Sequence, residues 1–283
     1  MSAAIALLAS LLWGTADFLG GTASRRLPVA SVLAVSQGVA LLGLLPLALV
    51  LGAYDEPRGY LLPGIAAGLC GVVGLAAFYR ALALGTMGVV APIAALGVVV
   101  PIGAGLLAGE SPSGLQVAGI LAALGGVVLA SGPELNGKAG ATPLVLAAVA
   151  AVGFGAVLVL LAEGSAGGGA GAVVMTLILM RVTSVTVMSV VLLTVARQRG
   201  TPFGVRRADL PVLLAIGALD VGANGAFSLS SQGDLISITA VLASLYPVVT
   251  VLLARQLQGE RLVGPQVPGV VLALLGVVLL AGA

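Results

Sequence analysis

The fold of this chain is decided by GESPSGLQVAG at residues 109–119, which returns as GERLVGPQVPG at residues 259–269. Similarly, GGVVLASG at residues 125–132 returns as LGVVLLAG at residues 275–282. The residues that recur at this offset of 150 are Gly109, Glu110, Gln116, Val117, Gly119, Ala123, Leu124, Gly126, Val127, Val128, Leu129 and Gly132. A long fixed period in an apolar chain indicates two copies of one membrane unit. If each copy holds an odd number of helices, the two copies are inverted relative to each other.

The composition excludes a water-soluble protein. Hydrophobic residues make up 60% of the 283 residues and charged residues only 8%, and the mean hydropathy is +1.22. No soluble domain of this size tolerates such a surface, so we expect a polytopic membrane protein. The net charge of +2 is small, and the basic residues lie in short loops. Nucleic-acid binding has no support, and the expected partners are membrane lipid and a small-molecule substrate.

The absence of histidine restricts the chemistry. The chain has no His and one cysteine, Cys70, which lies in an apolar run. Neither a disulfide nor a thiolate metal site can form within the chain, and we expect no metal and no cofactor. No nucleophile with its base is recognisable, so we expect no enzyme. Any proton coupling must run through carboxylates.

Ten apolar stretches of about 20 residues, the length that crosses a bilayer, divide the chain. The N-terminal stretch has no basic region before it, so we interpret it as a first membrane helix and not as a removed signal peptide. Residues 1–136 then form a first five-helix repeat, and residues 137–283 form a second, inverted one. The predicted spans are Ala3–Gly20, Val29–Leu51, Tyr60–Leu84, Gly88–Ala108, Leu115–Ser131, Pro143–Leu161, Gly171–Val195, Leu210–Leu229, Leu235–Gln256 and Val263–Leu280.

Cap residues mark several of the predicted helix starts. Asp209 and Asp234 precede the eighth and ninth spans, Thr142 precedes Pro143, and Ser113 with Gln116 has the spacing of a capping box.

Loop charges predict the orientation. Ten basic residues fall on one side and Arg58 alone on the other, which assigns the basic side to the cytoplasm. Ten spans then leave both termini outside, and we expect a multi-pass protein of the bacterial cytoplasmic (inner) membrane. The basic set is Arg25, Arg26, Arg80, Lys138, Arg197, Arg199, Arg206, Arg207, Arg255 and Arg261, and the acidic set opposite is Asp55, Glu56, Glu110, Glu163 and Asp234.

Weaker internal matches extend the repeat. ALLASLLWG near Trp13 is similar to AAVAAVGFG near Phe154, and AFYRALALG from Ala77 is similar to AFSLSSQG from Ala226. With Trp13-Gly14, the stretch AFYRALALGTMGVVAPIAAL and the Gly-Glu pairs that end helices four and nine, the chain resembles the drug/metabolite transporter superfamily, in particular the bacterial EamA-type exporters.

The resemblance implies a central cavity lined by helices of both halves, with helices five and ten at the periphery. Tyr246-Pro247 matches the family pattern of helix nine. The equivalent of Pro247 in the first half is Gly97, and we expect Pro92 and Pro101 to bend helix four instead.

Ionisable residues within the spans are the first candidates for a substrate site, because each is costly in lipid unless it faces a partner or water. Arg181 and Asp220 both fall about ten residues into their helices, close to the midplane, where they could pair. Asn224 lies one turn beyond Asp220 on the same face. In the first half, Gln37 occupies roughly the position that Arg181 has in the second.

Two interpretations of these residues stay open. Arg181 and Asp220 form either a buried ion pair that only fixes two helices or a site where the guanidinium receives a carboxylate or phosphate. Asp17 and Asp220 are candidates for proton coupling, although Asp17 could instead pair with Arg25 or Arg26.

Three aromatic residues and two glutamates complete the candidates. Trp13, Tyr79 and Tyr246 either line the cavity or pack against lipid and neighbouring helices. Glu110 and Glu260 recur at helix ends on opposite faces, where capping or gate stabilisation is favoured over substrate contact.

The sequence favours a secondary transporter, with an exporter suggested by the resemblance alone. Alternating access around a midplane site would carry a small metabolite, such as an amino acid or another zwitterionic or anionic solute. The alternatives are a channel-like facilitative pore or a multidrug efflux carrier. Small-xxx-small spacings at Gly64/Gly68, Gly119/Ala123 and Gly269/Ala273 favour tight packing in a monomer over a dimer interface, so we expect a monomer or a weak homodimer.

Overall fold

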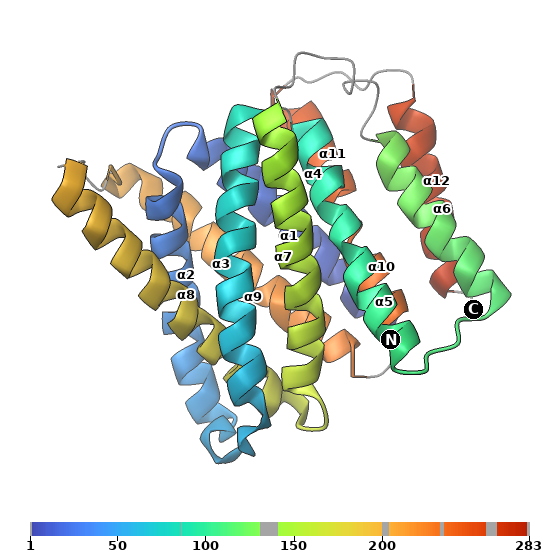
Figure 1. Cartoon of the computed structure of the whole chain (residues 1–283), viewed down its shortest axis with the longest axis horizontal. Coiled ribbons are helices and arrows are strands. Elements are labelled where there is room, and N and C mark those ends of the chain that lie inside the picture. The colour runs from blue at the N-terminus through green and yellow to red at the C-terminus, as the bar shows by residue number, and fades with distance from the viewer. Residues whose placement is uncertain are drawn as a thin grey trace.

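The fold is all-helical in the residues that the computed structural model describes, which are 2–85, 87–130, 141–199, 204–232, 235–258 and 265–281 (Figure 1). These ranges contain no strand. The α-helices are α1 Ser2–Ser24, α2 Val29–Val50, α3 Leu61–Leu84, α4 Met87–Ala95, α5 Val99–Leu107, α6 Gly114–Ala130, α7 Ala141–Ser165, α8 Gly169–Arg199, α9 Leu210–Ser230, α10 Ile236–Ala243, α11 Tyr246–Gln258 and α12 Gln266–Ala281. The short 3-10 turns are η1 Ala53–Asp55, η2 Arg58–Tyr60, η3 Leu96–Val98 and η5 Arg207–Asp209.

In the part of the chain that the structure describes, seven helical segments are long and apolar enough to cross a membrane. They correspond to predicted spans one to three and six to nine, with α10 and α11 counted together. The other three predicted spans are shorter: α6 and α12 have 17 and 16 residues, and α4 and α5 have nine residues each. The chain is therefore a multi-pass membrane protein.

Two predicted spans are interrupted at their centres. Within the predicted spans 88–108 and 235–256, η3 lies between α4 and α5, and a turn at Ser244–Leu245 separates α10 from α11. Proline explains both breaks: Pro101 and Pro247 have no N–H for the carbonyl four residues earlier. Gly97, in the first break, lies against the backbone of Ala151 in α7 so closely that a side chain could not fit between them.

The helices pack in a repeated pattern of pairs. The helix α1 packs along α9, and α3 packs along α7; α2 lies against α8 and also contacts α9, while α8 also contacts α3. Small residues permit these approaches: Gly68 of α3 lies against Met180 O of α8, and Gly217 of α9 lies against Ser36 O of α2.

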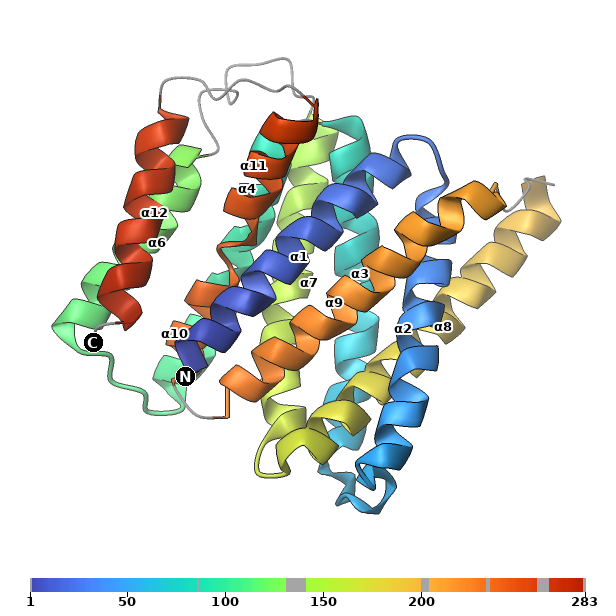
Figure 2. The same cartoon turned by 180° about the vertical axis from the view of Figure 1, so that it is seen from behind.

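The pair α6 and α12 stands at the edge of the molecule (Figure 2). Gly119 and Ala123 of α6 face Gly276 and Leu280 of α12, so Gly119 and Ala123 pack within the monomer. The peripheral place of helices five and ten, which the family resemblance implies, is confirmed.

The polar caps agree in part with the sequence. Ser113 and Gln116 form the predicted capping box, with Gln116 N donating to Ser113 Oγ over 3.2 Å and Ser113 N donating to Gln116 Oε1 over 2.8 Å. Asp209 does not cap α9 with its side chain. It instead accepts a hydrogen bond from Arg206 N and pairs with Arg26 at 3.1 Å. Asp234 lies outside the described residues.

Candidate substrate-binding cavity

A cavity lies in the middle of the helical body, between segments that are far apart in the sequence. The space inside it that the centre of a water molecule can reach is about 80 Å³. Residues from α1, α2, α3, α4, η3, α7, α8, α9 and α11 line it. Most of its lining is apolar, and its ionisable side chains are Asp17, Arg181, Asp220 and Tyr246.

The polar side of the cavity is a network of four buried residues, which we call the midplane cluster: Gln37, Arg181, Asp220 and Asn224. Arg181 Nη1 donates a hydrogen bond to Gln37 Oε1, and Arg181 Nη2 lies 3.0 Å from Asp220 Oδ2. Gln37 Nε2 donates to the same carboxylate oxygen over 3.3 Å. The predicted proximity of Arg181 to Asp220 is therefore observed, and Gln37 joins the pair.

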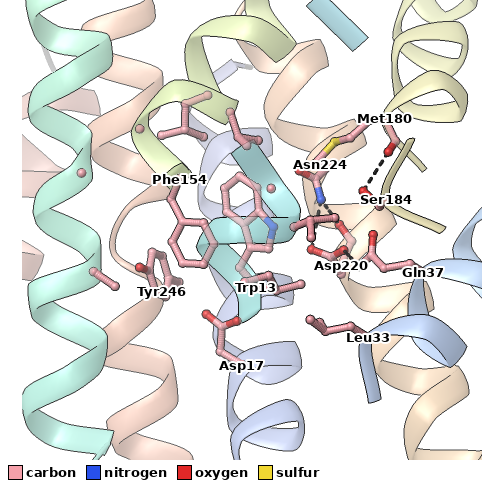
Figure 3. A pocket seen from close by; sticks show the side chains of 18 of the residues that line it. Trp13, Asp17, Leu33, Gln37, Phe154, Met180, Ser184, Asp220, Asn224 and Tyr246 are labelled. Atoms are coloured by element: carbon pink, nitrogen blue, oxygen red, sulfur yellow. Dashed lines mark hydrogen bonds between the residues drawn. The ribbon is translucent and has the colours of Figure 1, made fainter. Parts of the chain in front are cut away.

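Asn224 completes the cluster from the next turn of α9. Its Nδ2 donates to Asp220 Oδ1 over 3.1 Å and to the Asp220 backbone carbonyl over 2.6 Å. Figure 3 shows Asn224, Asp220 and Gln37 gathered on one side of the cavity. Each Asp220 carboxylate oxygen thus has a donor or a cation beside it, which reduces the cost of the charge within the membrane.

Arg181 retains hydrogen-bonding capacity. Its side chain is 1% exposed, yet Nε has no hydrogen-bond partner, and Nη2 lies within ion-pair distance of Asp220 without the alignment of a hydrogen bond. A guanidinium has five N–H donors, and only the bond to Gln37 is well directed here. The unused donors belong to a residue that lines the cavity, where they can receive an anionic group.

Asp17 lies apart from these four residues. It is 6% exposed and lines the cavity one helical turn after Trp13. No ion pair joins Asp17 to Arg25 or Arg26, and Arg26 pairs instead with Asp209. Among the described residues Asp17 makes no hydrogen bond or ion pair, so this carboxyl group is available to a substrate or a proton.

Aromatic rings form the opposite side of the cavity, where Figure 3 shows Trp13, Phe154 and Tyr246. The Trp13 ring lies 6.0 Å from that of Phe227, and the Tyr246 ring lies 6.5 Å from that of Phe78, edge to face. The Tyr246 hydroxyl is buried without a hydrogen-bond partner. Trp13 and Tyr246 thus line the cavity, which is one of the two positions that the sequence left open.

Tyr79 is not among the residues that line the cavity. Its ring packs into the space that Gly20 leaves on α1, and it lies 6.2 Å from the ring of Phe78. Its direction on α3 turns it toward α1, within range of electrostatic interaction with Asp17, Asp220 and Arg181.

Phe154 and Ser184 are lining residues that the sequence analysis missed. The signal for Phe154 was present, since the repeat aligns it with Trp13. Ser184 follows Arg181 by three residues on the same helix face, and its hydroxyl donates to Met180 O over 2.8 Å.

Glu110, between α5 and α6, connects the first half of the chain to the start of α10 in the second half. Its carboxylate accepts hydrogen bonds from Ile236 N at 2.6 Å and from the backbone N and hydroxyl of Ser237 at 3.2 and 2.6 Å. It therefore caps α10, as predicted, and does not line the cavity. Glu260 lies outside the described residues. Within the described ranges, no group of three or more Cys, Asp or Glu side chains could hold a metal ion.

Comparison with known proteins shows a similarity to membrane transporters in residues 1–132. The model of the EamA-like transporter family matches residues 1–132, which confirms the resemblance to the drug/metabolite transporter superfamily. A solved crystal structure superposes with a TM-score of 0.73 over 98% of this chain and 95% of the other, at 20% identity. That likeness shows a shared fold. No curated protein matches the sequence.

Proposed function

Because residues 1–132 carry the sequence of the EamA-like transporter family, we propose that this protein is a secondary transporter for a small anionic or zwitterionic metabolite. Substrate binds in the central cavity and reaches each side of the membrane in turn. One observation carries the substrate class: a buried arginine, Arg181, lines the cavity, and its Nε–H has no protein partner.

Alternating access requires inverted halves, and the packing supports ten spans in two inverted repeats, residues 1–136 and 137–283. In the proposed repeat α1 corresponds to α7 and α9 corresponds to α3, so the α1–α9 contact has its counterpart in the α7–α3 contact. The helices α2 and α8 correspond to each other, as do α6 and α12, and each of these pairs is in contact. The breaks also correspond, since Gly97 and Pro247 occupy equivalent positions. Gln37 and Arg181, equivalent residues in helices two and seven, meet in one hydrogen bond.

The orientation follows from the positions of the charges. The ends of α1, α3, α8 and α11 and the start of α9 lie at one end of the molecule in Figures 1 and 2. The described basic residues at this end are Arg25, Arg26, Arg80, Arg197, Arg206, Arg207 and Arg255. The positive-inside rule assigns this end to the cytoplasm, so both termini lie outside and the membrane is the bacterial inner one. Export, rather than uptake, rests on the family resemblance.

Arg181 has two roles in this proposal. In the empty site Asp220 and Gln37 hold the guanidinium, and in the occupied site a carboxylate of the substrate takes the free donor positions. Asp17 and Asp220 are the proton-coupling groups, because both line the cavity and Asp17 has no protein partner among the described residues. Trp13 and Tyr246 pack against the apolar part of the solute.

A channel-like pore is the competing function, and a multidrug efflux carrier is a second alternative. Electrical recording separates the pore from a carrier: currents far above carrier turnover, without counterflow, would support the pore. Efflux of bulky apolar cations that does not depend on Arg181 would support the multidrug carrier.

A thermal-shift screen of the purified protein against small carboxylates, amino acids and phosphates tests the substrate class. A bound solute at 100 times its Kd stabilises the folded state by about 2.7 kcal/mol, so it raises the melting temperature. The Arg181→Lys variant keeps the charge but loses the planar fork, and it should lose the shift. An equal shift in wild type and Arg181→Lys would remove Arg181 from the binding site.

A further inference from the structure

A second hollow lies between the midplane cluster and the C-terminal end of α2, and it opens toward the lipid. It lies between α2 and α8 on one side and α1 and α9 on the other, and we call it the lateral crevice. Every residue that lines it is Gly, Ala, Val, Leu or Ile. Representative lining residues are Leu8, Leu44, Leu51, Val173, Val221 and Leu229.

The crevice lies beside the place where α2 and α9 approach most closely in the glycine contacts. At Ser36 and Gly217 their backbones are in contact, and below this level the two helices diverge in Figure 2. Two glycines in this region have empty space beside them. A Cβ at Gly43 would meet nothing within 4 Å, and one at Gly225 would meet only Leu177 Cδ1 at 3.8 Å. Van der Waals contact is the main force that holds helices together in lipid, so an unfilled crevice would cost stability.

The dimensions of the crevice match one leaflet. Along α2 and its C-cap it runs from Val39 to Leu51, and on α9 from Ala218 to Leu229. At the helical rise of 1.5 Å per residue, these distances are roughly 18 and 16 Å. Half of a hydrocarbon core is about 15 Å thick. The inner end lies at the midplane cluster, since Ala40 follows Gln37 by three residues and Leu177 precedes Arg181 by four.

We propose that the lateral crevice binds one acyl chain of a phospholipid from the leaflet at the α2 C-terminal end, the outer leaflet in the proposed orientation. The chain enters between the diverging α2 and α9, fills the space beside Gly43 and Gly225, and ends below Arg181 and Asp220. The apolar lining offers no partner to a headgroup, so the headgroup stays at the membrane surface.

The single tryptophan, Trp13, reports on this site. It lies on α1, whose Ile5 and Leu8 line the crevice, and its neighbour Leu12 lies against Gly222. In nanodiscs made with brominated-chain phosphatidylcholine, a bromine within the crevice quenches Trp13 fluorescence at short range. Discs with the unbrominated lipid give the reference intensity.

Two variants separate an acyl chain within the crevice from lipid around the protein. Gly43→Leu fills the crevice from α2, and Gly225→Leu fills it from α9. Gly38→Leu is the matched control, because its Cβ also meets nothing within 4 Å but Gly38 does not line the crevice. Melting temperatures identify any variant that fails to fold, and the other crevice variant then carries the test.

We expect the bromine-dependent quenching to be strong in wild type and Gly38→Leu and reduced in both crevice variants. Equal quenching in all four proteins would overturn the proposal. If a second copy of the chain covers the crevice, quenching should occur in discs that hold one chain and be lost in discs that hold two. This result would also overturn the proposal.

Discussion

Arg181 connects three helices at the centre of the protein, through Gln37 of α2 and Asp220 of α9. In water such a network would contribute little. Within the membrane each charged member depends on the others, because removing one leaves an uncompensated charge. The same cluster is therefore both a structural element and the proposed binding site, and experiments must separate these roles.

Stability measurements distinguish the members of the cluster. Asp220→Asn leaves the buried guanidinium without its counter-ion, and we expect a loss of about 3–5 kcal/mol. Gln37→Ala removes a neutral partner and should cost about 1–3 kcal/mol. Melting temperatures of the purified variants test this order, with the exposed Asp55→Asn as control. An Asp220→Asn protein as stable as wild type would show that the ion pair has no structural role.

Asp17 allows a test of proton coupling. Asp17→Asn keeps the shape and polarity of the side chain but cannot exchange a proton. We expect substrate uptake into proteoliposomes to lose its dependence on an imposed pH gradient, while ligand-induced thermal shifts remain. Unchanged gradient dependence in Asp17→Asn would assign the coupling to another group, with Asp220 the next candidate.

Sequence reasoning predicted much of the site because polar residues in apolar spans are few. Arg181, Asp220, Asn224 and Asp17 could be found from that rarity alone, and all four line the cavity. Tyr79 packs against α1, one of the two environments that the sequence left open, because the direction in which an aromatic side chain points depends on helix rotation. An apolar span with little amphipathicity does not encode that rotation.

At the scale of the elements, glycine contacts decide where helices approach. Gly217 of α9 lies against Ser36 O of α2, and it marks the level where the two helices touch. The sequence alone does not show which of the 42 glycines make such close contacts. The sequence analysis noted Pro101 and Pro247 but did not predict the interruptions between α4 and α5 and between α10 and α11. A proline can bend a helix or interrupt it, and the packing of Gly97 against Ala151 favours interruption in the first half.

A matched pair of glycine substitutions on α9 tests this view. In Gly217→Ala the new methyl group would collide with Ser36 O, a backbone atom, and we expect a cost of about 1–3 kcal/mol. In Gly222→Ala the nearest atom, Leu12 Cδ1, is at 3.5 Å, so stability should hardly change. Thermal unfolding in detergent measures both, and equal melting temperatures would contradict the close α2–α9 contact.

At the scale of the whole molecule, the repeat at residues 109 and 259 has its clearest counterpart in the α6–α12 pair. The repeat could be recognised from sequence because these peripheral helices share one packing role. The central helices have diverged, as Gln37 and Arg181 illustrate. The recurrence could therefore be recognised in the sequence, whereas the cavity became visible only through the packing of the helices.

The proposed inverted topology makes a labelling prediction. With the single native cysteine removed by Cys70→Ala, Asp55→Cys should react with an impermeant thiol reagent added to intact cells. Arg206→Cys should react only after the membrane is opened, because the basic end faces the cytoplasm in the proposed orientation. The reverse result would invert the orientation, and reaction of both sites in intact cells would contradict the span count.

The central claim is that the two halves carry solute by exposing the Arg181 site alternately to each side. The most direct test is counterflow: liposomes preloaded with unlabelled ligand from the thermal-shift screen are diluted into a trace of the same ligand carrying a radioactive label. A carrier predicts transient accumulation of label above equilibrium in wild type, and a loss of about 10–100-fold in initial rate in Arg181→Lys if charge-assisted hydrogen bonds worth about 1.5–3 kcal/mol are removed. Label that only equilibrates, or counterflow that is unchanged in Arg181→Lys, would contradict the account.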